Sequence, residues 1–290
     1  MISHRLCAPI SERSDDGINA SPKRIVFLSV EGTKTEISYF TWIHRYREAL
    51  NIRSVVHLSV LLRYDTESDP DHVLALLTDY LNLREEGITA EQLHDLLPDP
   101  NGFTLRQIQD YLDGTGAEHD RMRLDEEIRL KGIERQYRYQ KELSDYQGES
   151  DVFAIVIDRD CQSHTAETLM RIFQQCEAKG VSCFLTNPCF EFWLLLHVCD
   201  IDSSDSELMD KLLQNKKISN KHTYVSKMLS EYARHSKKIT EEAFCRYYLP
   251  NVDSAIARAD HFPQKKEKLL TQVGSNLPQL FRILREELST

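Results

Sequence analysis

The chain has 290 residues, a formal net charge of −10 and 41% hydrophobic residues. A chain of this length and apolar content can bury a full core, as one large domain or two smaller ones. The acidic net charge argues against a protein whose whole surface binds nucleic acid indiscriminately. No apolar run approaches the roughly 20 residues that a transmembrane helix needs. Residues 1–22 also lack the apolar core of a signal peptide, so we expect a cytoplasmic protein.

The seven cysteines are odd in number, and no two of them form a Cys-x-x-Cys pair. This pattern argues against both a disulfide framework and a structural zinc site. We therefore expect most of the cysteines to be buried thiols.

Residues 1–22 are expected to be a flexible lead-in, followed by an α/β core over residues 23–199. Apolar periodicity predicts strands at 25–30, 55–62, 152–157 and 181–186, and helices between them at 35–50, 71–83 and 165–179. Such alternation implies a mainly parallel sheet that is covered by helices on both faces, with right-handed crossovers.

Two regions depart from this alternation. Residues 84–150 contain a Pro- and Gly-rich turn and a long charged segment, and we interpret them as a helical insertion in the core. Residues 200–290 are predicted to form a mostly helical, locally basic region that packs on the core.

The first candidate site follows the predicted strand 25–30. Glu31 ends that strand and Gly32 comes next, which permits a tight turn with the backbone close to a ligand. In an open α/β sheet, ligands and catalytic groups gather at the C-terminal ends of the strands. Since a carboxylate at this turn caps nothing obvious, we expect Glu31 to be functional, for example as a ligand of a divalent metal ion.

The residues after Gly32 leave two interpretations of Glu36 open. A phosphate-binding P-loop is disfavoured, because that motif needs two glycines and this turn has one. Thr33 and Glu36 fit a capping box, in which the third helical side chain bonds back to the cap amide. Glu36 is therefore either a capping residue or a metal ligand.

A second pair of acids follows the predicted strand 152–157. Asp158 and Asp160 lie two positions apart, so both project from one face if the strand continues. Two adjacent carboxylates repel each other, and a bound Mg²⁺ or Mn²⁺ relieves that repulsion. The alternative is a turn in which the aspartates accept hydrogen bonds from nearby amides.

The third candidate is Glu191, within the run 187–197. Pro188 fits the first turn of a helix, so Glu191 is expected near a helix N-terminus. There it either completes a metal site or only interacts favourably with the helix dipole. His197 has helical spacing from Phe190 and is expected to be a packing histidine with satisfied hydrogen bonds.

Basic residues are concentrated in residues 211–238, which contain eight Lys or Arg and a single acid. The stretch fits either a phosphate-binding surface or a solvated helical face whose charge is balanced elsewhere. If it binds phosphate, Lys227, or else Lys216 or Lys217, is expected to neutralise the charge of the scissile phosphate.

Together these motifs resemble a known family. The residues that carry the resemblance are, in order, 31–36, 158–160, 187–197, 224–227, 248–252 and 255–259. They are similar to the Toprim nucleases of the RloB-like, abortive-infection AbiL type, over about residues 23–288. The resemblance implies a Toprim fold, a compact parallel α/β domain shared with topoisomerases, primases and overcoming-lysogenization-defect nucleases.

The resemblance also implies an activity, since the strand-end glutamate and the Asp-x-Asp pair of that family bind Mg²⁺. We expect Mg²⁺- or Mn²⁺-dependent cleavage of phosphodiester bonds in DNA or RNA, tRNA included. The residues expected to act as ligands or in catalysis are Glu31, Glu36, Asp158, Asp160, Glu191 and Lys227. The expected context is bacterial anti-phage defence, with an ABC- or AAA-type ATPase encoded alongside as the partner. This chain has no Walker motif, so ATP hydrolysis would be the partner's, and homo-oligomerisation is left open.

Two other functions compete with a nuclease. A degenerate Toprim domain would bind nucleic acid or the ATPase without turnover, although all three core acids are present here. A haloacid-dehalogenase-like phosphatase would use Asp158 as its nucleophile. That family normally has Thr or Val two residues after Asp-x-Asp, where this chain has Gln162, and Glu31 would have no role.

Overall fold

The computed structural model describes residues 24–32, 34–52, 56–60, 69–86, 89–97, 102–130, 151–220, 222–234 and 238–286. The chain divides into two compact units. Of the described residues, 24–77 and 151–286 belong to the first unit, and 78–130 belong to the second. The expected lead-in, residues 1–22, lies outside the described residues.

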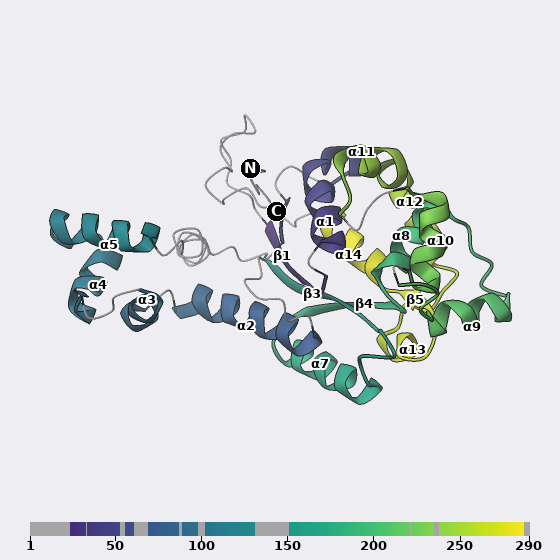
Figure 1. The fold of residues 1–290 in the computed structure, drawn as a ribbon, viewed down its shortest axis with the longest axis horizontal. Coiled ribbons are helices and arrows are strands. Elements are labelled where there is room, and N and C mark those ends of the chain that lie inside the picture. The colour runs from purple at the N-terminus through teal and green to yellow at the C-terminus, as the bar shows by residue number, and fades with distance from the viewer. Residues whose placement is uncertain are drawn as a thin grey trace. The chain divides into compact units, whose positions relative to one another are not determined.

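The centre of the first unit is a sheet that has five strands among the described residues (Figure 1). The strands are β1 Arg24–Val30, β2 Val56–Val60, β3 Val152–Asp158, β4 Ser182–Asn187 and β5 Gly274–Ser275. Their order across the sheet is β2-β1-β3-β4-β5. The first four are parallel, and the short β5 pairs antiparallel with β4. The predicted α/β class with a mainly parallel sheet is confirmed, and the architecture is consistent with a Toprim-like fold.

Helices alternate with the parallel strands and then form most of the C-terminal part of the first unit. Its α-helices are α1 Thr35–Arg45, α7 Ala166–Ala178, α8 Phe190–Val198, α9 Ser206–Gln214, α10 Tyr224–Tyr232, α11 Glu241–Ala243, α12 Val252–Ala259, α13 Lys266–Leu269 and α14 Leu277–Arg285. Shorter turns of other helix types are the 3-10 helices Glu48–Leu50 and Leu249–Asn251 and the π-helix Phe244–Tyr248. No helix in the described ranges is both long enough and apolar enough for a bilayer span.

The connections around β1 and β3 determine where a ligand crevice lies. α1 leads from β1 to β2 over one face of the sheet, and α7 leads from β3 to β4 over the other (Figure 1). The neighbouring strands β1 and β3 are thus followed by helices on opposite faces. A topological switch point of this kind opens a crevice at the carboxyl ends of the two strands. Glu31 and Asp158 stand at those two ends.

The core on the α1 face is built around α8. Val26, Leu28 and Val30 of β1 point into this core, because alternate side chains of a strand share a face. In α8 every residue from Phe190 to His197 except Glu191 is buried. A helix that is apolar on all sides must be covered on all sides, and α10, α12 and α14 contribute to that cover.

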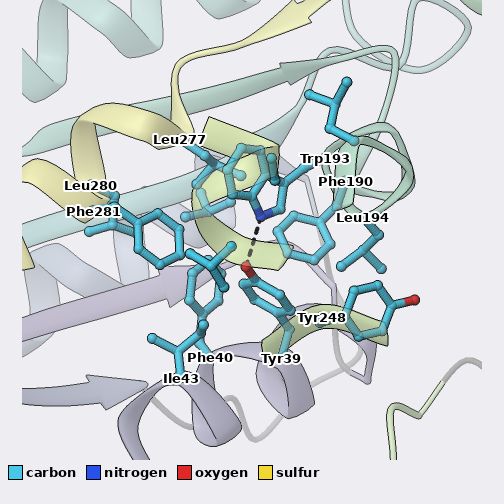
Figure 2. Packing of buried hydrophobic residues seen from close by; sticks show 14 of the residues in the cluster. Tyr39, Phe40, Ile43, Phe190, Trp193, Leu194, Tyr248, Leu277, Leu280 and Phe281 are labelled. Carbon is cyan, nitrogen blue, oxygen red and sulfur yellow. Dashed lines mark hydrogen bonds between the residues drawn. The ribbon is translucent and has the colours of Figure 1, made fainter. Parts of the chain in front are cut away.

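Three buried residues of this core form a closed hydrogen-bond network, of which Figure 2 shows the bond between Trp193 and Tyr39. Trp193 Nε1 donates to the Tyr39 hydroxyl at 3.1 Å, and that hydroxyl lies 3.0 Å from His197 Nε2. His197 Nδ1 lies 3.0 Å from the Trp193 carbonyl oxygen. A carbonyl only accepts, so Nδ1 carries the proton and Nε2 accepts from Tyr39. Burial lowers the pKa of His197 to about 3, and the expectation of a satisfied packing histidine is confirmed.

The second unit is helical in its described part. α2 Pro70–Glu86 begins in the first unit and ends in the second, which also contains α3 Ala90–Leu96, α4 Leu105–Leu112 and α5 Glu118–Leu130. α3 and α4 each begin with a capping box, Thr89 with Gln92 and Thr104 with Gln107. Residues 87–88, 98–101 and 131–150 of the predicted insertion lie outside the described residues.

Candidate functional site

A cleft of about 470 Å³ opens in the first unit at the carboxyl ends of β1 and β3. One side of it, here called the acidic wall, consists of Glu31, Asp158, Asp160 and Glu191. These acids come from the end of β1, the end of β3 and the first turn of α8. The structure therefore brings four of the predicted site residues together from three distant segments of the chain.

Glu31 connects the ends of β1 and β3. Its backbone N–H donates to the Val156 carbonyl at 3.0 Å, which extends the strand pairing one residue past β1. Its Oε2 accepts a hydrogen bond of 2.8 Å from the Asp158 N–H. Its Oε1 lies 3.2 Å from His164 Nε2, and this contact raises the pKa of His164. The carboxylate thus has both a backbone and a side-chain partner.

Glu36 reaches the same corner because residue 32 is a glycine. A Cβ at Gly32 would lie 1.8 Å from Glu36 Oε2, far inside any van der Waals contact. The Glu36 side chain is buried on α1, although it is not part of the acidic wall. The predicted capping box involves Thr33, which lies outside the described residues. The N-cap of α1 is Lys34, and this residue makes no side-chain cap hydrogen bond.

The chain turns sharply between Asp158 and Asp160. β3 ends at Asp158, and Asp160 has a φ of 22°, so the strand does not continue to the second aspartate. Both side chains nevertheless line the cleft. Asp160 accepts hydrogen bonds from the Gln162 N–H at 3.2 Å and the Ser163 hydroxyl at 2.8 Å. The alternative of an aspartate that bonds to its own turn therefore describes Asp160 in this structure.

Arg159, between the two aspartates, fixes this turn to the rest of the sheet. Its N–H donates to the Thr186 carbonyl of β4 at 2.8 Å. Its buried guanidinium donates from Nε to the Leu270 carbonyl at 2.7 Å and from Nη1 to the His164 carbonyl. The neighbouring Asn187 is held in the same way, by donation to the Leu269 carbonyl at 2.7 Å. The C-terminal segment thus supports the strand ends that carry the site.

Asp158 is the electrostatic centre of the acidic wall. Burial raises its pKa well above the usual value, and the carboxylates of Glu31, Glu36 and Glu191 raise it further. The Phe190 N–H at the start of α8 donates to Asp158 and acts in the opposite direction. A buried acid with three acidic neighbours is the arrangement that a bound cation relieves.

Glu191 is the second residue of α8, which begins at Phe190 after the N-cap Cys189. Pro188 therefore precedes the helix and does not occupy its first turn. At this position the helix dipole favours an acid, and the same side chain lines the cleft. Both interpretations of Glu191 are compatible with its placement.

A second part of the cleft lining, here called the α10 wall, comes from the α9–α10 loop and from α10. Its residues are Asn215, Lys217, Asn220, His222, Thr223, Ser226, Leu229, Ser230 and Ala233. Asn215 anchors this wall, since its side chain accepts from the Val225 N–H at 3.0 Å and lies 3.5 Å from Cys189 Sγ. The basic stretch recognised in the sequence thus borders the acids.

The lysines of that stretch are placed differently from one another. Lys217 lines the cleft. Lys227 is half exposed on α10, lies outside the cleft lining and forms an ion pair with Glu231 at 3.3 Å. Lys216 is exposed, and its carbonyl accepts from the Tyr224 N–H. A catalytic role for Lys227 stays a prediction, and Lys217 is the lysine at the cleft.

Sequence reasoning missed the role of His164 beside Glu31 and the anchoring role of Arg159. Arg159 stands inside the Asp-x-Asp motif and is buried in the structure, but the sequence alone indicates neither its burial nor its hydrogen-bond partners. His164 follows Asp158 by six positions, and nothing in the sequence indicates that its ring returns to Glu31.

Within the described residues, no three His, Cys, Asp or Glu side chains already stand in a metal-holding arrangement. Glu31 faces the Asp158 N–H and His164, and Asp160 faces Gln162 and Ser163. Binding of an ion at the acidic wall therefore requires rotation of these two side chains away from their present partners.

Comparison with known proteins gives one assignment. Searches of curated proteins and of solved structures found no match to this chain. A protein-family model described as RloB-like protein matches residues 26–284, which include both walls of the cleft. Because this match covers most of its length, the chain belongs to the RloB-like protein family.

Proposed function

We propose that this chain is a metal-dependent Toprim nuclease of the AbiL type, which hydrolyses phosphodiester bonds in DNA or RNA, tRNA included. The observation that carries this proposal is the convergence of Glu31, Asp158, Asp160 and Glu191 on one cleft. The cleft lies at the switch point of a parallel sheet, where ligands of such folds bind.

The donor set fits a hard divalent cation. Mg²⁺ and Mn²⁺ prefer oxygen ligands, and the acidic wall offers only carboxylates as charged groups. Glu31, Asp158 and Asp160 would hold the ion, and Glu191 and Glu36 would add ligands or orient them. The raised pKa of Asp158 supports this assignment, because burial and the neighbouring carboxylates disfavour its charged form and a bound cation would offset both. A bound ion would supply an activated water and would stabilise charge on the phosphate.

The protein's own groups would orient the reacting parts. Arg159 fixes the turn that carries both aspartates, through carbonyls on β4 and on the C-terminal segment. His164 holds one oxygen of Glu31. Lys217 lines the same cleft as the acids and would bind a phosphate of the substrate there. Without a cation, the four carboxylates of the acidic wall would repel that phosphate.

The wider setting is part of the same proposal. The resemblance to AbiL-type proteins supports a cytoplasmic effector of bacterial anti-phage defence that is controlled by an ABC- or AAA-type ATPase encoded beside it. The chain has no Walker motif of its own, so nucleotide hydrolysis would be assigned to the partner.

The test is cleavage of labelled DNA and tRNA by the full chain with its neighbouring ATPase, in Mg²⁺ or Mn²⁺. Glu31→Gln keeps an acceptor for the Asp158 N–H but removes the charge. We expect it to lower the cleavage rate by about 10² or more. The matched control is Glu177→Gln, an exposed glutamate on α7. Undiminished, metal-dependent cutting by Glu31→Gln would contradict the proposal, and native protein that binds but never cuts would favour a binding module.

A further inference from the structure

α10 presents a single face to the cleft. Ser226, Leu229 and Ser230 of α10 line the cleft, with Thr223 at the N-cap and Ala233 at the C-cap of the same helix. Their spacings of three or four positions place them along one side of it, and this stripe is about 15 Å long at 1.5 Å per residue. Leu229 and Ala233 make its far end partly apolar.

Four polar side chains around the same cleft have no partner among the residues that the structure describes. Lys217, Asn220 and His222 of the α9–α10 loop, and Gln162 beside the acidic wall, all line the cleft. Their side chains make no hydrogen bond or ion pair with any residue that the structure describes. Glu31 and Asp160 of the acidic wall, by contrast, already accept hydrogen bonds. The α10 wall therefore offers one lysine together with amide and imidazole groups to a ligand.

These groups are complementary to one kind of ligand. A lysine suits a phosphate, and amide and imidazole groups suit sugar hydroxyls and base edges. The apolar end formed by Leu229 and Ala233 suits the face of a base or of a sugar. A nucleotide unit carries all three features along its length.

The size of the cleft favours a single strand over a duplex. Its volume of about 470 Å³ lies in the lower part of the usual range for small-molecule sites, about 300–1,000 Å³. Such a cleft accommodates a segment on the scale of a nucleotide. Enzymes that act in clefts of this kind take a strand end, a loop or an unstacked nucleotide.

We propose that the α10 wall binds a single-stranded segment of nucleic acid, with a phosphate against Lys217 and an unstacked nucleotide along the stripe on α10. This inference rests on the proposed nuclease function, because that function makes nucleic acid the ligand. It deepens that function by naming the substrate class, which is single strands, loops and strand ends in place of continuous duplex.

The first experiment measures fluorescence anisotropy of the full chain with labelled oligonucleotides, in Ca²⁺, so that binding is recorded separately from turnover. Single strands of DNA and RNA are compared with blunt duplexes of the same sequence. We expect single strands of at least one of the two to bind at least about tenfold more tightly than the duplex. Equal or tighter binding of the duplex, or no binding of single strands, would overturn the inference.

The second experiment uses variants on the two parts of the wall. The binding constant for a single strand falls as the salt concentration rises, and Lys217→Ala is expected to make the slope of log K against log salt concentration less steep by about 0.7. This is the contribution of one phosphate contact on a single strand. Ser230→Glu places a negative charge on the stripe and is expected to weaken single-strand binding about tenfold or more. The control is Lys211→Ala on α9, an exposed lysine outside the cleft that pairs with Glu207. Circular dichroism verifies that each variant is folded.

The inference would be overturned if Lys217→Ala kept the salt dependence of single-strand binding and Ser230→Glu kept the affinity for single strands. The outcomes also separate the two proposals. If single strands bind through Lys217 but the native chain cuts nothing, the nuclease function fails and the binding site stands. If cutting depends on Glu31 while single strand and duplex bind alike, the nuclease function stands and this inference fails.

Discussion

Glu31 Oε2 accepts a hydrogen bond from the Asp158 N–H at 2.8 Å, although 127 positions separate the two residues. One acid of the cleft thus fixes the backbone of another, at the ends of two neighbouring strands. Substitutions at Glu31 therefore affect both the charge of the acidic wall and the pairing of the strand ends.

This double role predicts different stabilities for two substitutions of Glu31. Glu31→Ala leaves the Asp158 N–H without its acceptor, at a cost of about 1–3 kcal/mol. Glu31→Gln retains an acceptor and is expected to cost less than about 1 kcal/mol. Urea unfolding of both variants measures the difference, and equal stabilities would show that the hydrogen bond contributes little.

Gly32→Ala is expected to displace Glu36 and to destabilise the protein by about 1–3 kcal/mol, because the new methyl group overlaps the buried carboxylate. The cost should largely disappear in a Glu36→Ala background, where the overlap no longer exists. Gly116→Ala is the control, since its nearest atom would lie at 3.4 Å. Equal effects of Gly32→Ala in both backgrounds would contradict the packing of Glu36 against this turn.

Asp158→Asn is expected to stabilise the metal-free protein at neutral pH. The pKa of Asp158 is raised in the folded state, so its ionisation lowers stability above the unfolded value of 3.8. Removing the charge should therefore raise the free energy of unfolding, which urea unfolding at neutral pH measures. The control is Asp210→Asn, at an exposed residue of α9, and it should change the free energy of unfolding little.

The same variant should lose its response to metal. A ligand at 100 times its Kd stabilises a native protein by about 2.7 kcal/mol. We expect Mg²⁺ or Mn²⁺ to raise the melting temperature of the native protein and of Asp210→Asn, and to raise that of Asp158→Asn much less. An equal rise in all three proteins would place the ion elsewhere.

Tyr39→Phe should destabilise the core by about 1–3 kcal/mol, because it leaves Trp193 Nε1 and His197 Nε2 buried without partners. Tyr111→Phe removes a hydroxyl that donates to Asp125 at the surface, and it should cost less than about 1 kcal/mol. Urea unfolding compares the two. A cost for Tyr39→Phe no larger than that of the control would contradict the closed network.

The neutral state of His197 predicts a pH dependence of stability. Its pKa is about 3 in the folded protein and 6.5 in the reference state, so the unfolded chain binds the additional proton. The contribution of His197 is present above pH 6.5, and it is lost as the pH falls from 6.5 toward 3. Its maximal slope is about 1.4 kcal/mol per pH unit.

His197→Gln should remove this part of the slope between about pH 6.5 and 5. His119→Gln, at a side chain that is 80% exposed, should retain it. Unfolding by urea at several pH values measures both slopes. Identical slopes in the native protein and His197→Gln would show that the imidazole is already charged in the fold.

The sheet and half of the site were predictable from the sequence. Strands β1 and β3 are continuous apolar runs, the pattern of strands covered on both faces. Parallel strands end at the same edge of a sheet, so the order of elements places Glu31 and Asp158 at one edge. The structure adds that β1 and β3 are neighbours in the sheet, which brings the two acids together.

The other half of the site depends on tertiary packing. The basic stretch indicated a phosphate-binding surface, but the side chains that face the cleft are selected by the packing of α10 on α8 and by the bonds of Asn215. The two-residue strand β5 carries no sequence signal. Asn276 helps to hold it, since its side chain accepts from the Leu185 N–H at 2.7 Å and donates to the Cys183 carbonyl at 3.2 Å.

Arg159 and Asn187 donate to the carbonyls of Leu270 and Leu269, two consecutive peptide groups that lie 111 and 82 positions further along the chain. Neither leucine lines the cleft. Because both acceptors are main-chain oxygens, an exchange of either leucine side chain would leave both hydrogen bonds in place as long as the backbone keeps its path. The turn that carries Asp158 and Asp160 thus depends on the backbone course of a remote segment and not on its side-chain chemistry.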